Sequence, residues 1–129
     1  MVKSERWLTK RRLLIAAVAL TLFAVGRWHS AYLHGALDAW VDRARGQSKF
    51  KSYGYVMGWE GEYRRLLRDR YGVTVEPVAG CLVTEDLVRY VHGYNDVSCA
   101  RLQARFGKDI FAECKKEART AWKQLHPGD

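Results

Sequence analysis

Residues 13–26 contain no charged side chain, and they constrain the fold more than any other stretch of this sequence. They read LLIAAVALTLFAVG, and Lys10, Arg11 and Arg12 stand directly before them. A membrane-spanning helix needs roughly 20 apolar residues, so this run is short on its own. Long basic side chains can reach the bilayer surface from within a helix, and Trp and Tyr favour that level. We therefore predict a spanning helix over residues 9–32 that continues outside the bilayer.

The charges around this run predict an orientation. Residues 1–12 carry five Lys or Arg against one Glu, whereas residues 71–129 carry eight of each sign. Basic residues tend to stay on the cytoplasmic side of a membrane. We expect a bacterial inner-membrane protein with a cytoplasmic N-terminus and a periplasmic C-terminal domain. The basic residues beside the apolar run also suit anionic lipid head groups, and the neutral C-terminal half argues against nucleic-acid binding.

A cleaved signal peptide is the alternative reading of the same segment. Its basic start and short apolar centre fit, but the best cleavage sequence, Ala24-Val25-Gly26, lies inside the apolar run. We therefore favour a retained helix. The tetrapeptide ending at Cys81 (VAGC) resembles a lipid-attachment signal, but it lies more than fifty residues beyond the apolar run, so we treat it as a coincidence.

The rest of the chain predicts a small, mostly helical domain with a minor β element. We assign residues 1–40 to the basic N-terminus and anchor helix, 41–56 to a linker, and 57–129 to the exported domain. The domain should begin with a short amphipathic helix, whose apolar face is formed by Trp59, Tyr63, Leu66, Leu67 and Tyr71 and which Gly72 ends. One or two short strands are expected within residues 73–83.

Two long helices are predicted to complete the domain. Thr84 and Asp109 are typical N-cap residues, and Gly107 should end the first of these helices after Phe106. Because the connection between them is short, we expect the helices to fold back on each other as an αα-hairpin. Trp122 should then lie in the core, on the inner face of the second helix.

Three cysteines in an oxidising compartment suggest a disulfide. Cys99 and Cys114 lie equally far from the predicted hairpin turn, so they should face each other. Cys81 would lie about 20 Å from Cys99, too far for a bond that needs Cα atoms about 6 Å apart. We predict a Cys99–Cys114 disulfide with Cys81 free and buried, and three reduced core cysteines are the alternative.

No catalytic or metal-binding pattern is recognisable. His92 and Cys99 would lie about 10.5 Å apart along one helix, beyond direct proton transfer. His29 and His34 are five residues apart and diverge around a helix, so they do not form a metal-binding pair. The polar stretch around Gly93 is more simply a point of close helix approach than a ligand site. We expect no enzymatic activity, no metal and no cofactor.

Small residues suggest a helix–helix contact where the anchor leaves the membrane, because they let two backbones come close. We predict that another membrane protein packs along this segment, on Gly26, Trp28, Ser30, Ala31, Tyr32, Gly35, Ala39 and Trp40. Leucine at Gly35 should then disrupt the complex and leave the fold intact. A chance run of small residues is the alternative.

These expectations favour a non-enzymatic function. The first hypothesis is an accessory or scaffold subunit of a membrane-associated complex, anchored once in the membrane. The second is a membrane-tethered inhibitor or immunity-type protein that binds an exported toxin or enzyme. The third is a small enzyme whose site forms only in three dimensions.

Overall fold

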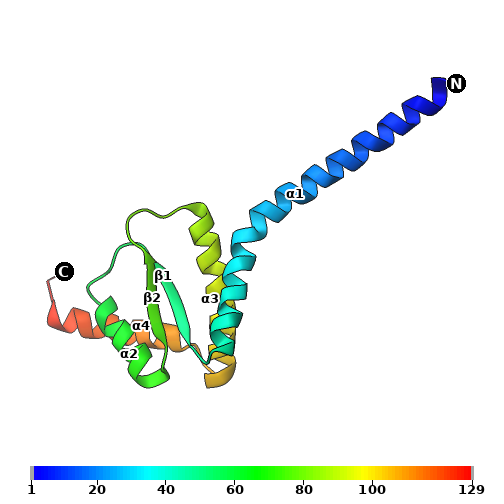
Figure 1. The fold of residues 1–129 in the computed structure, drawn as a ribbon. Coiled ribbons are helices and arrows are strands. Elements are labelled where there is room, and N and C mark those ends of the chain that lie inside the picture. Colours follow the sequence, from blue (N-terminus) through cyan, green and yellow to red (C-terminus); the bar gives the residue numbers. More distant parts are fainter. Residues whose placement is uncertain (1, 129) are drawn as a thin grey trace.

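The computed structural model describes residues 2–128, with side chains from Lys10 onward. These residues form four helices and two strands (Figure 1). In chain order the elements are α1 Val2–Ala44, β1 Lys49–Tyr53, α2 Glu60–Tyr71, β2 Thr74–Ala79, α3 Glu85–Phe106 and α4 Ile110–Leu125. The predicted class, mostly helical with a small β element, is confirmed.

The long helix α1 lies in two environments. Its first half projects away from the rest of the protein, and its second half packs beside α3 (Figure 1). The stretch Lys10–Ala44 is long and apolar enough to cross a membrane by length and composition, although a signal sequence passes the same test. The predicted helix over residues 9–32 is therefore present, and it is a candidate membrane span.

The two strands are parallel neighbours, and the chain passes from one to the other through α2. Tyr53 at the end of β1 lies opposite Ala79 at the end of β2. Strand β1 lies within residues 41–56, so that stretch is not the irregular linker that was predicted. The most buried side chain of β1 is Lys51, whose Nζ lies 4.6 Å from the centre of the Tyr94 ring. A search for alternating apolar residues misses a strand that is buried in this way.

The core lies where α2, α3 and α4 meet below the strands. Its buried side chains are Leu66, Leu67, Val73, Leu102, Ile110, Cys114 and Ala118. The amphipathic pattern of α2 is confirmed, because its two leucines are among the most buried residues of the protein.

The helix ends follow the sequence closely. The Thr84 hydroxyl accepts a hydrogen bond from the Leu87 N–H, and an Asp109 oxygen accepts two from the first turn of α4. Gly72 and Gly107 end α2 and α3 with φ angles of 66° and 69°, which glycine adopts without strain. All four predicted caps are confirmed.

The predicted αα-hairpin is not formed. α4 leaves the end of α3 sideways and packs against α2 (Figure 1). Arg70 of α2 donates to Glu117 at 2.6 Å, and the Tyr71 hydroxyl donates to Glu113 at 2.7 Å. The periodicity of α4 thus gives its buried face but not the neighbour that covers it, which is α2 through Leu66 and Leu67.

The direction of α4 also removes the reason for the predicted disulfide. Cys81, Cys99 and Cys114 are all free thiols. Equal distance from the turn places two residues at one height only when the helices are antiparallel, and these are not packed as a hairpin. Cys114 is buried in the core, Cys99 is half-buried, and Cys81 is exposed rather than buried as expected.

Trp122 likewise does not belong to the core. Its side chain is half-buried, and its ring stacks on His126 with the ring centroids 3.8 Å apart. Gly58 also packs against this ring. The prediction of a core tryptophan is therefore wrong, because α4 presents Cys114 and Ala118 to the core instead.

Candidate functional site

Helices α1 and α3 run parallel and touch through their backbones. A Cβ atom on Gly35 would overlap the carbonyl group of Tyr90, and one on Gly93 would overlap the carbonyl group of Tyr32. Only glycine permits an approach this close. We call this contact the seam, defined by residues 32–42 of α1 and 90–97 of α3. The expected close helix approach at Gly93 is confirmed, and its partner is α1 of the same chain.

A repeated motif explains why the contacts of the seam are reciprocal. Residues 32–38 read YLHGALD and residues 90–96 read YVHGYND, with Tyr, His, Gly and Asp at the same positions. The Tyr32 hydroxyl donates to Asp96 at 2.8 Å, and the Tyr90 hydroxyl donates to Asp38 at 2.7 Å. Each helix therefore gives the other the same two polar contacts, as in a local two-fold pair. Comparing seven-residue windows of the sequence with one another would have revealed this repeat.

A polar network joins the seam to the strands. Tyr94 donates to Asp42 at 2.6 Å, and Lys49 pairs with Asp42 at 3.5 Å. Lys51, only 8% exposed, pairs with Glu76 of β2 at 3.5 Å. These charge-assisted contacts tie α1, α3 and both strands into one unit.

Asn95 completes this unit by holding β1 against α3. Its side-chain oxygen accepts from the Lys51 N–H at 2.9 Å, and its amide nitrogen donates to the Lys51 carbonyl at 2.8 Å. The side chain thus takes the place that a neighbouring strand would occupy. From the sequence we expected Asn95 to form a local hydrogen bond, and this expectation is wrong, because its partner Lys51 lies 44 residues away and nothing local indicates it.

The electrostatics of the network favour a structural role over catalysis. Burial raises the pKa of both Tyr90 and Tyr94, and their hydrogen bonds to Asp38 and Asp42 raise it further. The hydrogen bond from Tyr94 lowers the pKa of Asp42, with a smaller contribution from Lys49. The phenols therefore remain donors and the Asp42 carboxylate remains ionised near neutral pH, so no proton moves between them.

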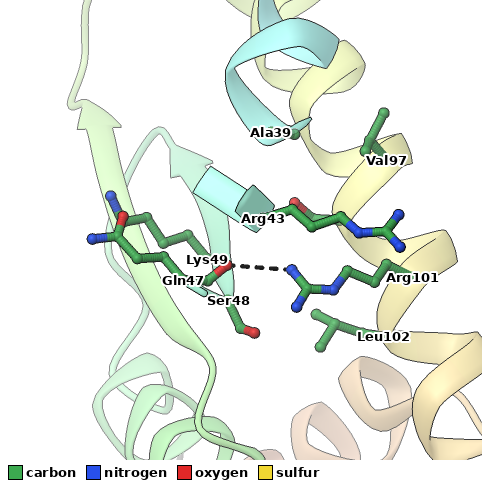
Figure 2. A pocket seen from close by; sticks show the side chains of 9 residues that line it. Ala39, Arg43, Gln47, Ser48, Lys49, Val97, Arg101 and Leu102 are labelled. Carbon is green, nitrogen blue, oxygen red and sulfur yellow. Dashed lines mark hydrogen bonds between the residues drawn. The ribbon is translucent and has the colours of Figure 1, made fainter. Parts of the chain in front are cut away.

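The end of the seam away from the apolar half of α1 holds a small pocket (Figure 2). Arg43 and Arg101, which occupy equivalent positions after the two repeats, reach across it in opposite directions. Arg101 donates to the Gln47 carbonyl at 3.4 Å, and the Arg43 guanidinium lies 4.8 Å from the centre of the Trp40 ring. The pocket measures about 10 Å³, which is space for about one water molecule. It is too small to hold a substrate.

The residues predicted to contact a partner fall on two faces of α1. Gly35 and Ala39 are buried against α3, and Tyr32 is bonded across the seam. A leucine at Gly35 would therefore break the fold, contrary to the expectation that only a complex would suffer. On the other face, Gly26 meets no atom within 4 Å of its Cβ position, and Trp40 is exposed.

The remaining predicted residues lie between these extremes. Ala31 is half-buried at the edge of the seam, and Ser30 is exposed, with its hydroxyl bonded to the Arg27 carbonyl of its own helix. Trp28 is exposed, and the Arg89 guanidinium lies 3.8 Å from the centre of its ring. The cation–π contact belongs to this chain, so only part of Trp28 remains available to another molecule.

The described residues contain no group of three or more His, Cys, Asp or Glu side chains placed to hold a metal ion. Burial raises the pKa of Cys99 to about 11, so this thiol is a poor nucleophile near neutral pH. Comparison with protein families, characterised proteins and solved structures found no match for this chain. Its own geometry is therefore the basis for a functional proposal.

Proposed function

We propose that this protein is a non-enzymatic single-pass membrane protein, acting as an accessory or scaffold subunit of a complex in the bacterial inner membrane. The observation that carries the proposal is the continuity of α1. One helix holds the candidate membrane span and then packs into the folded domain through the seam. A domain attached in this way is held in a fixed position beside the membrane rather than on a flexible tether.

The direction of insertion follows from the basic residues that precede the span. Lys10, Arg11 and Arg12 would remain in the cytoplasm, with anionic lipid head groups nearby. The domain would then lie in the periplasm. The exposed apolar side chains of residues 13–25 agree with a lipid environment, because α1 buries none of them against the domain.

A partner would contact the face of α1 that is opposite the seam. We call this face the outer stripe, formed by Gly26, Ser30, Leu33, Leu37 and Trp40. These positions lie on one side of a helix with 3.6 residues per turn, and Gly35 and Ala39 lie on the other. The side chains of Leu33, Leu37 and Trp40 are all more than half exposed. The outer stripe continues the apolar surface of the span into the water-exposed part of α1.

The charges beside the outer stripe indicate the chemistry of the partner. Arg27 and Arg43 flank it, whereas Asp38 and Asp42 point into the seam and are bonded there. The face is thus apolar at its centre and positive at its edges. We infer a partner helix that leaves the membrane beside α1, with an apolar face and acidic residues along its sides.

Co-purification from native membranes tests this proposal. Leu37→Glu should remove partners that co-purify with the unmodified protein, because it places a negative charge at the centre of the outer stripe. Leu125→Glu is the matched control, since Leu125 is similarly exposed (76% against 63%) but lies on α4. Equal recovery of partners with both variants would contradict the proposal. Capture of a soluble exported enzyme by both would favour an inhibitor or immunity-type protein.

A further inference from the structure

Two loops lie at the end of the domain from which α1 departs. Because β1 and β2 are parallel, the segments after them leave the same edge of the sheet, where Tyr53 lies opposite Ala79. α3 begins at this end too, and its Arg89 contacts Trp28 just beyond the apolar run of α1. Figure 1 shows both loops leaving the strands at the end where α3 begins, with the loop after β2 running to α3 and the loop after β1 turning down towards α2.

These loops are uncharged and apolar although 28% of the chain is charged. Residues 52–58 read SYGYVMG and residues 77–84 read PVAGCLVT. Their large side chains point outward: Leu82 is 90% exposed and Tyr55 is 80% exposed, with Val56 and Met57 more than half exposed. We call residues 53–57 and 80–83 the loop pair. Exposed apolar residues gathered in one place usually mark a contact surface.

The opposite end of the domain is charged. Since α1 and α3 run parallel, their C-terminal ends lie together there, with Arg45, Arg105 and Lys108 around them. The loop pair at the end near the candidate span is therefore uncharged, whereas the far end of the domain carries exposed basic residues. This difference in charge between the two ends is expected of a domain that touches a membrane with one end and faces water with the other.

The residues that line the space between the two loops are compatible with a shallow contact with lipid. A cleft of about 290 Å³ lies between them, with Tyr53, Val56 and Val78 in its wall. Its two charged residues, Glu60 and Arg64, neutralise each other at 3.2 Å.

The acidic residues at this end set a limit to the depth of contact. Glu85 and Asp86 in the first turn of α3 are exposed and pair with Arg89 at 2.9 Å and 3.1 Å. These carboxylates would stay at head-group level while the loop pair reaches just below it. Aromatic rings such as Tyr55 favour that boundary.

We propose that the loop pair enters the interfacial layer of the bilayer that α1 spans, giving the domain a second, shallow attachment to the same membrane. The inference rests on the proposed membrane anchoring of α1. The occupant is the lipid surface itself, because the loop pair leaves the strands at the same end of the domain from which α1 would enter the membrane.

Cys81 provides the probe, since it lies in the loop pair and is the exposed thiol of the three. The full chain is placed in phosphatidylcholine nanodiscs and labelled briefly at Cys81 with an environment-sensitive fluorophore, with mass mapping to confirm the site. We expect blue-shifted emission that is quenched by lipids carrying a nitroxide just below the head group, and little quenching by iodide in the water.

A label at the far end of α3 is the control. In a Cys81→Ala, Ala104→Cys variant the label lies on an exposed position about 30 Å further along the helix direction, so it should be quenched by iodide and not by the lipid nitroxide. Similar iodide quenching at both positions in nanodisc-incorporated protein would overturn the inference while leaving the anchoring intact. Failure of the chain to incorporate would overturn both.

The Leu82→Asp variant tests whether the loop pair, rather than the fluorophore itself, makes the contact with lipid. Leu82 is almost fully exposed, so the aspartate should leave the fold unchanged. We expect a several-fold loss of nitroxide quenching at Cys81, with unchanged incorporation into nanodiscs. Quenching equal to that of the unmodified protein would show that the fluorophore alone drew the loop to the lipid, and would overturn the inference.

Discussion

The carbonyl group of Tyr90 fills the space in which a side chain on Gly35 would begin. Any substitution at Gly35 must therefore push α1 away from α3. We expect Gly35→Ala to lower the free energy of unfolding by about 1–3 kcal/mol, the usual effect of overpacking a tight contact. Thermal or denaturant unfolding of the full chain in detergent would measure it.

Gly61 provides the matched control for that substitution. It lies in helix α2, and a Cβ atom there would meet nothing within 4 Å. Gly61→Ala should raise stability by up to about 1 kcal/mol, because alanine favours the helix more than glycine does. If both variants shift the unfolding midpoint in the same direction, the backbone contact across the seam is not as tight as described.

The pH dependence of stability should reveal the bond between Tyr94 and Asp42. That bond lowers the pKa of Asp42 from its ordinary value of 3.8, so the ionised carboxylate favours the folded state. Its stabilising contribution is complete above that ordinary value and is lost as the pH falls through the lower pKa of the folded protein. Asp42→Asn should therefore weaken the loss of stability in acid. The measurement is denaturant unfolding at neutral pH and again near pH 2.

Two tyrosine variants test whether Tyr94 is the cause. Tyr94→Phe removes the donor, so the pKa of Asp42 should rise, as followed by the carboxyl carbon chemical shift. Tyr90→Phe should leave this pKa nearly unchanged, because Tyr90 donates to Asp38 instead. An equal rise in both variants would assign the effect to a general loosening of the seam.

The thiols should react in the order of their exposure. Cys81 is exposed, Cys99 has its pKa raised to about 11 by burial, and Cys114 is buried. A colorimetric thiol reagent near pH 8 should modify one thiol rapidly in the folded protein and three in denaturant without reductant. Recovery of only one thiol in denaturant would mean that a disulfide forms after all. Peptide mapping would show whether it joins Cys99 to Cys114.

Reporter fusions would test the orientation of the chain. An alkaline phosphatase joined after Asp129 is active only when it is exported, so we expect activity from this fusion. A fluorescent protein that folds only in the cytoplasm should stay dark at the same position. A bright cytoplasmic reporter would reverse the orientation inferred from Lys10, Arg11 and Arg12.

Local features of this fold could be predicted from the sequence, whereas the pairing of its elements could not. Thr84, Gly107 and Asp109 set the helix ends through bonds and torsion angles within a few residues. Strand β1 depends on Lys51 meeting Asn95 and Tyr94, more than forty residues away, and no local pattern signals this.

The candidate site shows the same division. The small residues around Gly35 correctly indicated a close helix contact. Their spacing identifies the contacting face of α1, but it does not identify the helix that packs on that face. The helix that packs on this face is α3 of the same chain. Its Tyr, Gly and Asp occupy the same positions in residues 90–96 as in residues 32–38 of α1. The direction of α4 was missed for the same reason, because the α2 residues that contact it are distant in the sequence, as Tyr71 and Glu113 show with a bond across 42 residues.

Because α1 continues through the seam without a break, the domain has a fixed rotational orientation about the axis of the anchor helix. Each residue of an α-helix turns the chain by about 100°, so the number of residues between the span and Gly35 determines which way the domain faces. Adding one alanine between Gly26 and Ala31 would rotate the whole body by that angle, with every internal contact of the domain preserved. The length of this short segment is therefore as much a part of the protein's geometry as the residues in the seam.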